Sequence, residues 1–260
     1  MIIALRGHIR NSFDNNDLYK LIKKIVDDSP DTKIYIHTWH VKQANVSWRK
    51  LEKNDMLVTE EIIKNYFRDI SNKIEDILID DDSKLDLKCD YPNLVYWKRY
   101  LYGKKRLVEH ISTKEPADSV VIDTRFDVLD NSVKAYKNEI VRKISKTKDR
   151  DGNFIDKTYF LFRNGGCDNF YIIKLKNNKR LVSHIFSNID KLVPTVIINE
   201  RLFVRESMKM FGRKHVKIGG AQPTLVRYSL GLRNFPKFLK MCTTKFNYAR
   251  QLKRKAIKVA

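Results

Sequence analysis

Residues 119–127 read Ser-Val-Val-Ile-Asp-Thr-Arg-Phe-Asp, and this stretch decides the fold class. Its apolar first half is typical of a strand buried on both faces, which occurs mainly in parallel sheets covered by helices. Asp123, Arg125 and Asp127 follow where that strand ends. Because a carboxylate is costly to bury without a partner, we expect these groups to meet a cation or a ligand.

Comparable strands and helices alternate through the first half of the chain. Short strands are predicted at residues 2–5, 33–39 and 74–79. Helices are predicted at 16–26, from the N-cap Thr59 onward, and at 93–111. This alternation is typical of an α/β protein with right-handed crossovers. We therefore expect a Rossmann-like, mostly parallel central sheet flanked by helices.

The second half of the chain is less regular. The polar stretch 131–157 contains Asp-Arg-Asp-Gly at 149–152 and is interpreted as a loop. An apolar run at 159–162, the pair Gly165-Gly166 and a second apolar run to Ile173 come next. Helices are predicted at 182–189 and 200–211. Since no linker separates the halves, we expect a single domain over 1–232, with halves 1–130 and 131–232, and then a separate segment, 233–260.

The chain is strongly and unevenly basic. Its 260 residues include 52 Lys and Arg against 31 Asp and Glu, a net charge of +21. Fourteen of the basic residues and none of the acidic ones lie in residues 207–260. In 233–260, Phe, Leu and Tyr alternate with bases, which suits an anionic surface: a phospholipid leaflet, nucleic acid or a diphosphate substrate. A solvated basic tail without a partner is the alternative.

Composition and missing motifs exclude several protein classes. No run of eighteen apolar residues is present, so no membrane-spanning helix is expected. Three cysteines without a CxxC pair predict neither a disulfide framework nor a zinc site, and favour the cytoplasm. The motifs GxGxxG, GxxxxGK[ST] and GxSxG are absent, which argues against dinucleotide binding, P-loop chemistry and α/β-hydrolase chemistry.

Candidate site residues follow the first predicted strand, because α/β sheets bind ligands at the carboxyl ends of their strands. Gly7 would let the backbone approach a ligand closely. The flanking Arg6 and Arg10 could grip a diphosphate bidentately. An ordinary strand exit with solvated arginines is the alternative.

Acidic residues at two other strand ends are candidate metal ligands. Asp123 or Asp127 could hold Mg²⁺ or Mn²⁺ on a nucleotide diphosphate, because these ions prefer oxygen ligands. A simple pair between Asp123 and Arg125 at the sheet edge is the alternative. The triplet Asp80-Asp81-Asp82 is a second candidate, although such triplets are more often solvated turns.

Four motifs, taken in order, resemble glycosyltransferases of the GT-A type. They are residues 3–10, residues 34–39 with 47–49, residues 97–102 and residues 123–128. The similarity is to sugar transferases of bacterial capsule and lipopolysaccharide loci and of large DNA viruses, and it covers most of residues 1–205. It implies a GT-A-like sheet in which 1–130 is the nucleotide-sugar donor half and 131–232 the acceptor half.

The resemblance also implies an activity. Such an enzyme is a hexosyl- or deoxyhexosyltransferase that moves a sugar from a nucleotide-diphosphate donor to a glycan, glycoprotein or lipid-linked acceptor, assisted by Mn²⁺ or Mg²⁺. Asp127 is the implied metal ligand, although the motif departs from a strict DxD. Trp97 and Tyr100 lie at helical spacing, which is more often typical of a core position than of a base-stacking platform. The implied donor-binding residues are Arg6, Gly7, Arg10, Thr38, Trp39, Trp97, Asp123 and Arg125.

Two acids of the acceptor half are the implied catalytic residues. Inverting transfer needs a carboxylate that takes the proton of the acceptor hydroxyl. Asp168 follows the glycine pair and suits this role, while Glu200 stands at a helix start and could cap the helix instead. The segment 233–260 would hold a cytoplasmic enzyme against an anionic membrane. A basic nucleic-acid-binding protein without enzymatic activity is the alternative function, although no helix-turn-helix, zinc-finger or RNP signature supports it.

Overall fold

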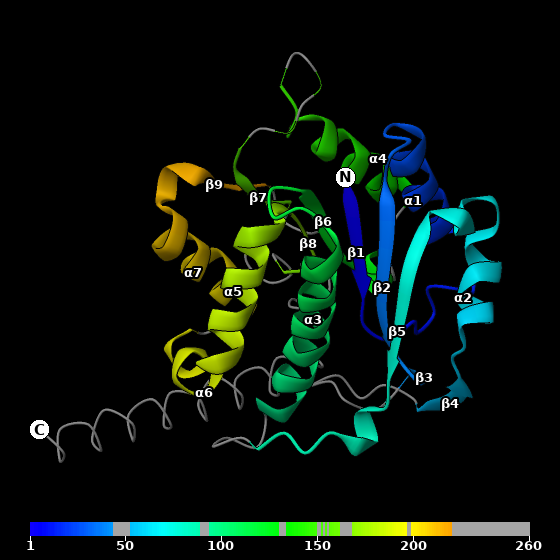
Figure 1. Ribbon diagram of the computed structural model, residues 1–260, viewed down its shortest axis with the longest axis horizontal. Helices are drawn as coiled ribbons and strands as arrows, with labels where there is room; N and C mark the ends of the chain where they lie inside the picture. Colours follow the sequence, from blue (N-terminus) through cyan, green and yellow to red (C-terminus); the bar gives the residue numbers. More distant parts are fainter. Residues whose placement is uncertain are drawn as a thin grey trace, which may run out of the picture.

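The computed structural model describes residues 1–43, 53–88, 94–129, 134–149, 152, 154, 156–161, 168–196 and 199–219. Its main sheet is drawn in Figure 1. In sheet order, the seven strands are β5 (Ile74–Asp80), β2 (Lys33–Trp39), β1 (Ile2–Arg6), β6 (Val120–Arg125), β8 (Phe170–Lys174), β7 (Thr158–Phe160) and β9 (Val216–Ile218).

Strands β5, β2, β1 and β6 are parallel to one another, whereas β8 is antiparallel to both of its neighbours and β9 is parallel to β7. The predicted α/β class with a mostly parallel central sheet is therefore confirmed. A second, two-stranded antiparallel sheet of β3 (Val41–Gln43) and β4 (Asn54–Leu57) was not predicted. It lies beyond the carboxyl end of β2.

Helices cover both faces of the main sheet (Figure 1). One face carries α1 (Asp17–Asp27), α2 (Glu60–Phe67) and α4 (Lys134–Ser145). The other carries α3 (Val95–Lys114), α5 (Leu175–Ser187) and α7 (Arg201–Phe211), with the short α6 (Ile189–Leu192) after α5.

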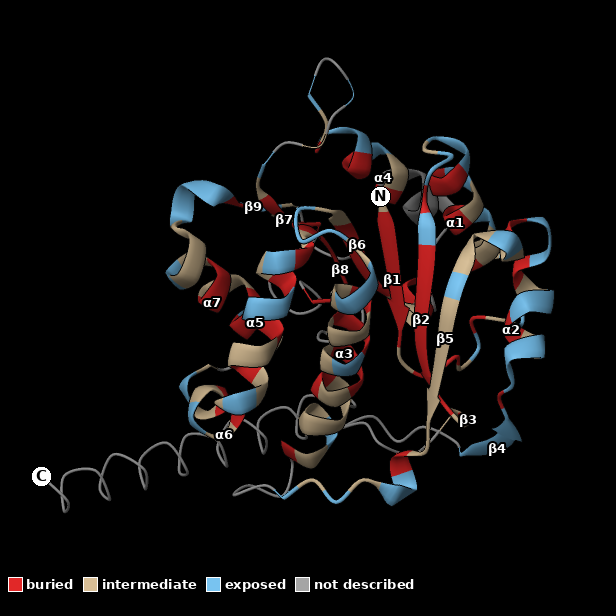
Figure 2. Ribbon diagram, in the orientation of Figure 1, coloured by how far each residue is buried: buried red, intermediate tan, exposed pale blue. Residues whose placement is uncertain are grey.

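Strand β1 lies at the centre of both hydrophobic cores. Ile3 and Leu5 belong to the core under α1 and α2, while Ile2 and Ala4 belong to the core under α3 and α5. All five residues of β1 are buried, as Figure 2 shows. The apolar run therefore forms a strand buried on both faces, as expected for the centre of a parallel sheet.

Several predicted boundaries are wrong. The polar stretch 131–157 contains the helix α4, which buries Ile140 and Ile144 in the core that also holds the apolar face of α1. Helix α5 begins at Leu175 rather than at 182, directly after β8. The predicted cap is confirmed, because Thr59 Oγ1 accepts a hydrogen bond from Ile62 N at 3.2 Å. Among the described helices, none is both long and apolar enough to cross a bilayer.

Candidate functional site

The direction of chain crossover reverses between β1 and β6. From β1 the chain passes to β2 on one side and returns to β6 on the other. Ligands of open α/β sheets bind outside the carboxyl ends of the strands at such a reversal. The last residues of the two strands, Arg6 and Arg125, are direct partners in the sheet register. We call residues 6–10 and 125–127 the β1–β6 edge.

Gly7 turns the chain out of β1. Its φ of +99° is a conformation that side chains rarely adopt, whereas a Cβ at this position would meet nothing within 4 Å. The turn is held by two hydrogen bonds: Gly7 N donates to His37 O, and Thr38 Oγ1 donates to Gly7 O, both at 3.0 Å. Thr38 is fully buried, so the structure gives it a role in positioning Gly7.

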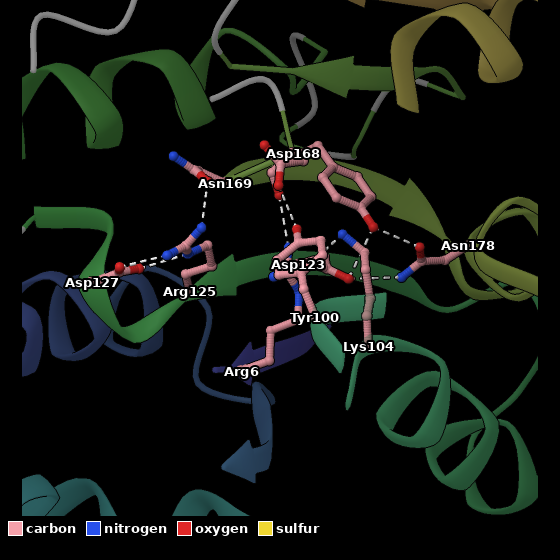
Figure 3. A network of polar contacts seen from close by, with 10 residues as sticks. Arg6, Tyr100, Lys104, Asp123, Arg125, Asp127, Asp168, Asn169 and Asn178 are labelled. Atoms are coloured by element: carbon pink, nitrogen blue, oxygen red, sulfur yellow. Dashed lines mark hydrogen bonds and ion pairs between the residues drawn. The ribbon is translucent and has the colours of Figure 1, made fainter. Parts of the chain in front are cut away.

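A buried charge network lies beneath this edge (Figure 3). Arg6 Nε donates to Asp123 Oδ1 at 2.7 Å, and Lys104 Nζ from α3 lies 3.2 Å from the same oxygen. Burial alone would raise the pKa of Asp123, but the charges of Arg6 and Lys104 outweigh it and hold that pKa below its usual value. Burial, with the charge of Arg6, lowers the pKa of Lys104 to about 7.

Polar side chains of the second half complete the network. Tyr171 and Asn178 both hydrogen-bond Asp123 Oδ2, at 3.0 and 3.3 Å. The Lys104 ammonium lies 4.2 Å from the ring centre of Tyr171 and 4.1 Å from that of Phe203. Asp123 is thus a buried structural anion that joins β6, α3, β8 and α5, rather than a residue exposed to a donor.

Asp168 lies at the start of β8, beside this network. Its Oδ2 accepts a hydrogen bond of 2.5 Å from Tyr100 of α3, and its backbone oxygen accepts one of 2.7 Å from Arg6 Nη2. Asp168 Oδ1 and Arg6 Nη1 are among the buried polar atoms that have no hydrogen-bond partner among the described residues. Leaving such groups unpaired costs about 1–3 kcal/mol each, so a ligand that pairs them gains that energy.

Asp127 is held by two arginines. Arg125 binds it through two nitrogens, Nε to Oδ1 at 2.6 Å and Nη2 to Oδ2 at 2.5 Å, and Arg10 Nη1 also contacts Oδ2. Burial would lower the pKa of Arg125, but the charge of Asp127 outweighs it and raises that pKa. A cation at Asp127 would have to displace a guanidinium. The donor set therefore does not fit the predicted metal ligand.

Arg10 itself has an uncommon backbone conformation. Its φ of +53° is left-handed, which costs a residue other than glycine about 1–2 kcal/mol. Its backbone nitrogen donates to Lys42 O at 2.9 Å, which ties the loop to β3. A small pocket of about 120 Å³ opens next to it. This pocket is lined by Arg10, Asn11, Lys42, Gln43, Lys53 and Asn54.

The two predicted tryptophans lie in aromatic clusters. Trp39 is buried among His37, His8 and Tyr102, with ring centres 5.1 to 6.2 Å away, so its faces are covered by other rings. Trp97 packs edge-on against Tyr100 at 5.0 Å and contacts the core under α3. Donor binding by either residue stays a prediction.

Glu200 immediately precedes α7, and its side chain makes no capping hydrogen bond to that helix. Glu200 is nevertheless the N-cap residue of α7, so the capping alternative and a catalytic role both stay predictions. The structure thus brings Arg6, Asp123 and Asp168 into one network, and Arg10, Arg125 and Asp127 into an adjoining one.

A second donor set lies at the ends of β2 and β5. Ligand atoms of His40, Asp81 and Asp82 lie within 4.8 Å of one another. His40 Nδ1 is 3.2 Å from Asp81 Oδ1, and Asp82 is 3.7 Å from Arg99 Nη1. One imidazole with two carboxylates is a set that suits Mn²⁺.

Lys104, Tyr171 and Asn178 were missed by sequence reasoning. Lys104 could have been found, because it stands at helical spacing between Leu101 and Val108 on the apolar face of α3. A lysine on such a face indicates a buried charge with a partner elsewhere.

Together, these features define an α/β protein in which arginines and aspartates gather at the carboxyl ends of β1 and β6. No protein-family model and no curated protein sequence matches the chain. Among solved structures it is similar to galactosyltransferase LgtC in complex with donor and acceptor sugar analogs, with a TM-score of 0.42, 14% identity, and coverage of 93% of this chain and 83% of that one. An active-site mutant of LgtC is similar at a TM-score of 0.38 and 13% identity, over 89% and 78% of the chains. Because these values are low, the function proposed next depends on the geometry of the site.

Proposed function

We propose that this chain is a nucleotide-sugar-dependent glycosyltransferase of the GT-A type. One observation carries the proposal: Arg6 Nη1, a donor, and Asp168 Oδ1, an acceptor, are both buried without partners among the described residues, on residues joined by a 2.7 Å hydrogen bond. A ligand that pairs both must offer an acceptor oxygen and a donor hydroxyl. A phosphate next to a sugar hydroxyl offers this combination.

The proposed reaction uses Asp168 as general base. The acceptor hydroxyl oxygen bonds to the anomeric carbon of the donor sugar, the bond from that carbon to the diphosphate oxygen breaks, and the hydroxyl proton passes to Asp168 Oδ1. Tyr100 holds the other carboxylate oxygen through its 2.5 Å hydrogen bond and so fixes the orientation of the base. The guanidiniums of the β1–β6 edge face the negative charge that develops on the leaving diphosphate.

The resemblance also implies Mn²⁺ or Mg²⁺. Asp127 does not fit a bound metal, and no step is derived through one there. The donor set of His40, Asp81 and Asp82 fits a divalent metal ion by its chemistry. An ion held there would supply a divalent charge at the ends of β2 and β5. Replacement of Asp81 with Asn should therefore weaken Mn²⁺ binding in a direct titration, whereas replacement of Asp127 with Asn should not.

Ligand-induced thermal stabilisation tests the proposed function. We expect at least one of UDP, GDP, CDP and dTDP to raise the melting temperature, because a ligand at a hundred times its Kd stabilises the folded state by about 2.7 kcal/mol. Replacement of Arg6 with Met should abolish that rise, while the same replacement at the exposed Arg213 should not. Stabilisation by oligonucleotides alone, lost as salt increases, would instead favour the nucleic-acid-binding alternative.

A further inference from the structure

The clearest departure from the expected site is the environment of Asp127. We call Arg10, Asp127 and Arg125 the arginine clamp. Its carboxylate is one-tenth exposed, and both of its oxygens accept hydrogen bonds from guanidinium groups. Two close cations stabilise this carboxylate as an anion. The arrangement orients the two arginines and leaves the carboxylate poorly available to a metal ion.

The two guanidiniums of the clamp remain accessible at the edge of the sheet. Arg125 is 24% exposed and Arg10 is 16% exposed. Arg125 uses Nε and one hydrogen of Nη2 on Asp127, and one hydrogen of Nη1 on Asn169 at 3.4 Å. Within the described residues, a guanidinium with five N–H groups thus keeps one on each terminal nitrogen for a ligand.

A third guanidinium belongs to the same anion-binding edge. Arg6 pairs with Arg125 across the β1–β6 register, and both guanidiniums lie over the ring of Tyr100, at 4.7 and 5.8 Å. Its Nη1 is the buried donor without a partner among the described residues. The guanidiniums of Arg6 and Arg125, from the ends of neighbouring strands, therefore both lie beside Tyr100 (Figure 3).

The local charge favours an anion over a second cation. Four cationic groups, from Arg6, Arg10, Arg125 and Lys104, stand against three carboxylates, from Asp123, Asp127 and Asp168. His8 adds no charge, because burial and the charge of Arg10 lower its pKa to about 3. The pocket beside Arg10 is lined by two lysines, each of which is paired with an aspartate: Lys42 with Asp14 and Lys53 with Asp55. Asp127, whose two oxygens both pair with guanidiniums, is poorly placed to ligate an incoming Mn²⁺, whereas the partly exposed guanidiniums would attract a diphosphate.

We propose that this chain binds and neutralises the diphosphate of its donor with Arg6, Arg10 and Arg125, and that Asp127 orients two of these arginines instead of ligating a metal. The inference rests on the proposed function, and it names the arginines that would neutralise the leaving diphosphate. Paired N–H groups of a guanidinium match two phosphate oxygens, and a fixed cation stabilises the leaving group without prior reorganisation. Asp127 is accordingly a positioning residue.

Calorimetric titration of the whole chain tests the clamp. The probes are a nucleoside diphosphate, its monophosphate and inorganic pyrophosphate, each with EDTA and with Mn²⁺. We expect the Kd of the diphosphate to be the same within about twofold with and without metal. Replacement of Arg125 with Lys should raise the diphosphate Kd about tenfold, the effect of one lost charge-assisted hydrogen bond. It should leave the monophosphate Kd unchanged, and Arg213→Lys should change neither.

The variant Asp127→Asn tests whether Asp127 orients the arginines or ligates a metal ion. We expect a weaker diphosphate Kd in EDTA and in Mn²⁺ alike, since the amide pairs only one guanidinium edge. Diphosphate binding that requires Mn²⁺ in the native chain and loses this requirement in Asp127→Asn would overturn the clamp. If no nucleotide binds in any condition while pyrophosphate binds in EDTA, the clamp stands and the proposed function fails. If neither binds, the clamp fails.

Discussion

Asp123 is the residue on which the site is built, because it is the shared counter-charge of two buried cations. Arg6 and Lys104 approach the same carboxylate oxygen from a strand and from a helix. Removing one partner of such a group leaves an uncompensated buried charge, whereas removing a surplus cation does not. Substitution of Asp123 should therefore lower the free energy of unfolding much more than substitution of a surplus cation.

We expect Asp123→Asn to lower the free energy of unfolding by about 3–5 kcal/mol, because Arg6 and Lys104 lose their common anion. Lys104→Met should stay within about 1 kcal/mol of the native chain, since a methionine can pack against Tyr171 and Phe203. Urea denaturation at pH 7 measures both. Equal losses in the two variants would show that Asp123 does not have this central role.

The lowered pKa of Lys104 predicts that the free energy of unfolding depends on pH. The pKa of Lys104 falls from 10.5 to about 7 on folding, so between these pH values the unfolded chain binds a proton that the folded chain lacks. The free energy of unfolding then rises with pH over this window. Lys104→Met keeps every other titrating group, so the difference in the free energy of unfolding between the native chain and this variant reports Lys104 alone. That difference should shift in favour of the native chain as the pH rises from 7 to about 10. A constant difference between the two would contradict the lowered pKa.

Asp168 is tested by turnover once a donor is known. Asp168→Asn should lower kcat about a hundredfold or more, the usual size of a general-base contribution, with little change in the Kd for donor. Glu200→Gln is the matched comparison, because Glu200 is the second implied catalytic acid. A parallel loss of donor affinity in Asp168→Asn would assign Asp168 to donor binding.

The site could be predicted in part. The ends of the predicted strands indicated Arg6, Gly7, Arg125 and Asp127 as site residues, because a strand end is predicted simply from where an apolar run stops. The partner of each charge could not be predicted. Arg6 and Asp123 are 117 residues apart, and only the register of β1 with β6 brings them together.

Among the elements, α3 approaches the sheet most closely at Gly103. A Cβ at this position would lie 2.5 Å from Cε1 and 2.7 Å from Nδ1 of His37 on β2. That imidazole cannot easily move, because its Nε2 is 3.2 Å from Asp80 and its ring stands perpendicular to Trp39. The glycine therefore sets the distance between α3 and β2.

We expect Gly103→Ala to destabilise the chain by about 1–3 kcal/mol, since the clash outweighs the roughly 1 kcal/mol by which alanine favours a helix. Chemical denaturation measures the change. Adding His37→Ala in the same chain should reduce the penalty, because the clashing ring is gone. A stabilised Gly103→Ala would mean that α3 can shift away from β2 at no cost.

Elements were predictable where apolar residues are continuous or strictly periodic. This holds for β1, β2, β6 and α1, whose buried residues follow one pattern from end to end. Helix α4 was missed because its sequence is polar except at a few apolar positions, among them Ile140 and Ile144. The antiparallel direction of β8 could not be predicted either, since a short apolar run fits both directions.

On the scale of the whole molecule, the basic charge remains to be explained. Residues 220–260, which include the whole basic segment 233–260, lie outside the described residues. The proposal for this segment is contact with an anionic membrane beside a lipid-linked acceptor. Each base near an anionic leaflet contributes about 1 kcal/mol, and this attraction decreases with salt.

The full chain should therefore sediment with anionic vesicles and not with neutral ones, and it should be released as salt increases. Replacement of Lys253, Arg254 and Lys255 with Gln should weaken this binding, while the same change at the exposed Arg213, Lys214 and Lys217 serves as the control. If a chain that ends at Leu232 folds and sediments equally well, the segment is not the anchor.

The central place of β1 has a consequence for biosynthesis. This strand pairs with β2, which begins at Lys33, but its other neighbour, β6, starts only at Val120. At ribosomal rates of about 5–20 residues per second, Arg6 waits on the order of ten seconds for its counter-charge. A nascent chain would have to keep this guanidinium in water during that time, because burying it alone is costly. Closure of the sheet centre, and with it of the β1–β6 edge, is therefore expected only after β6 has been synthesised.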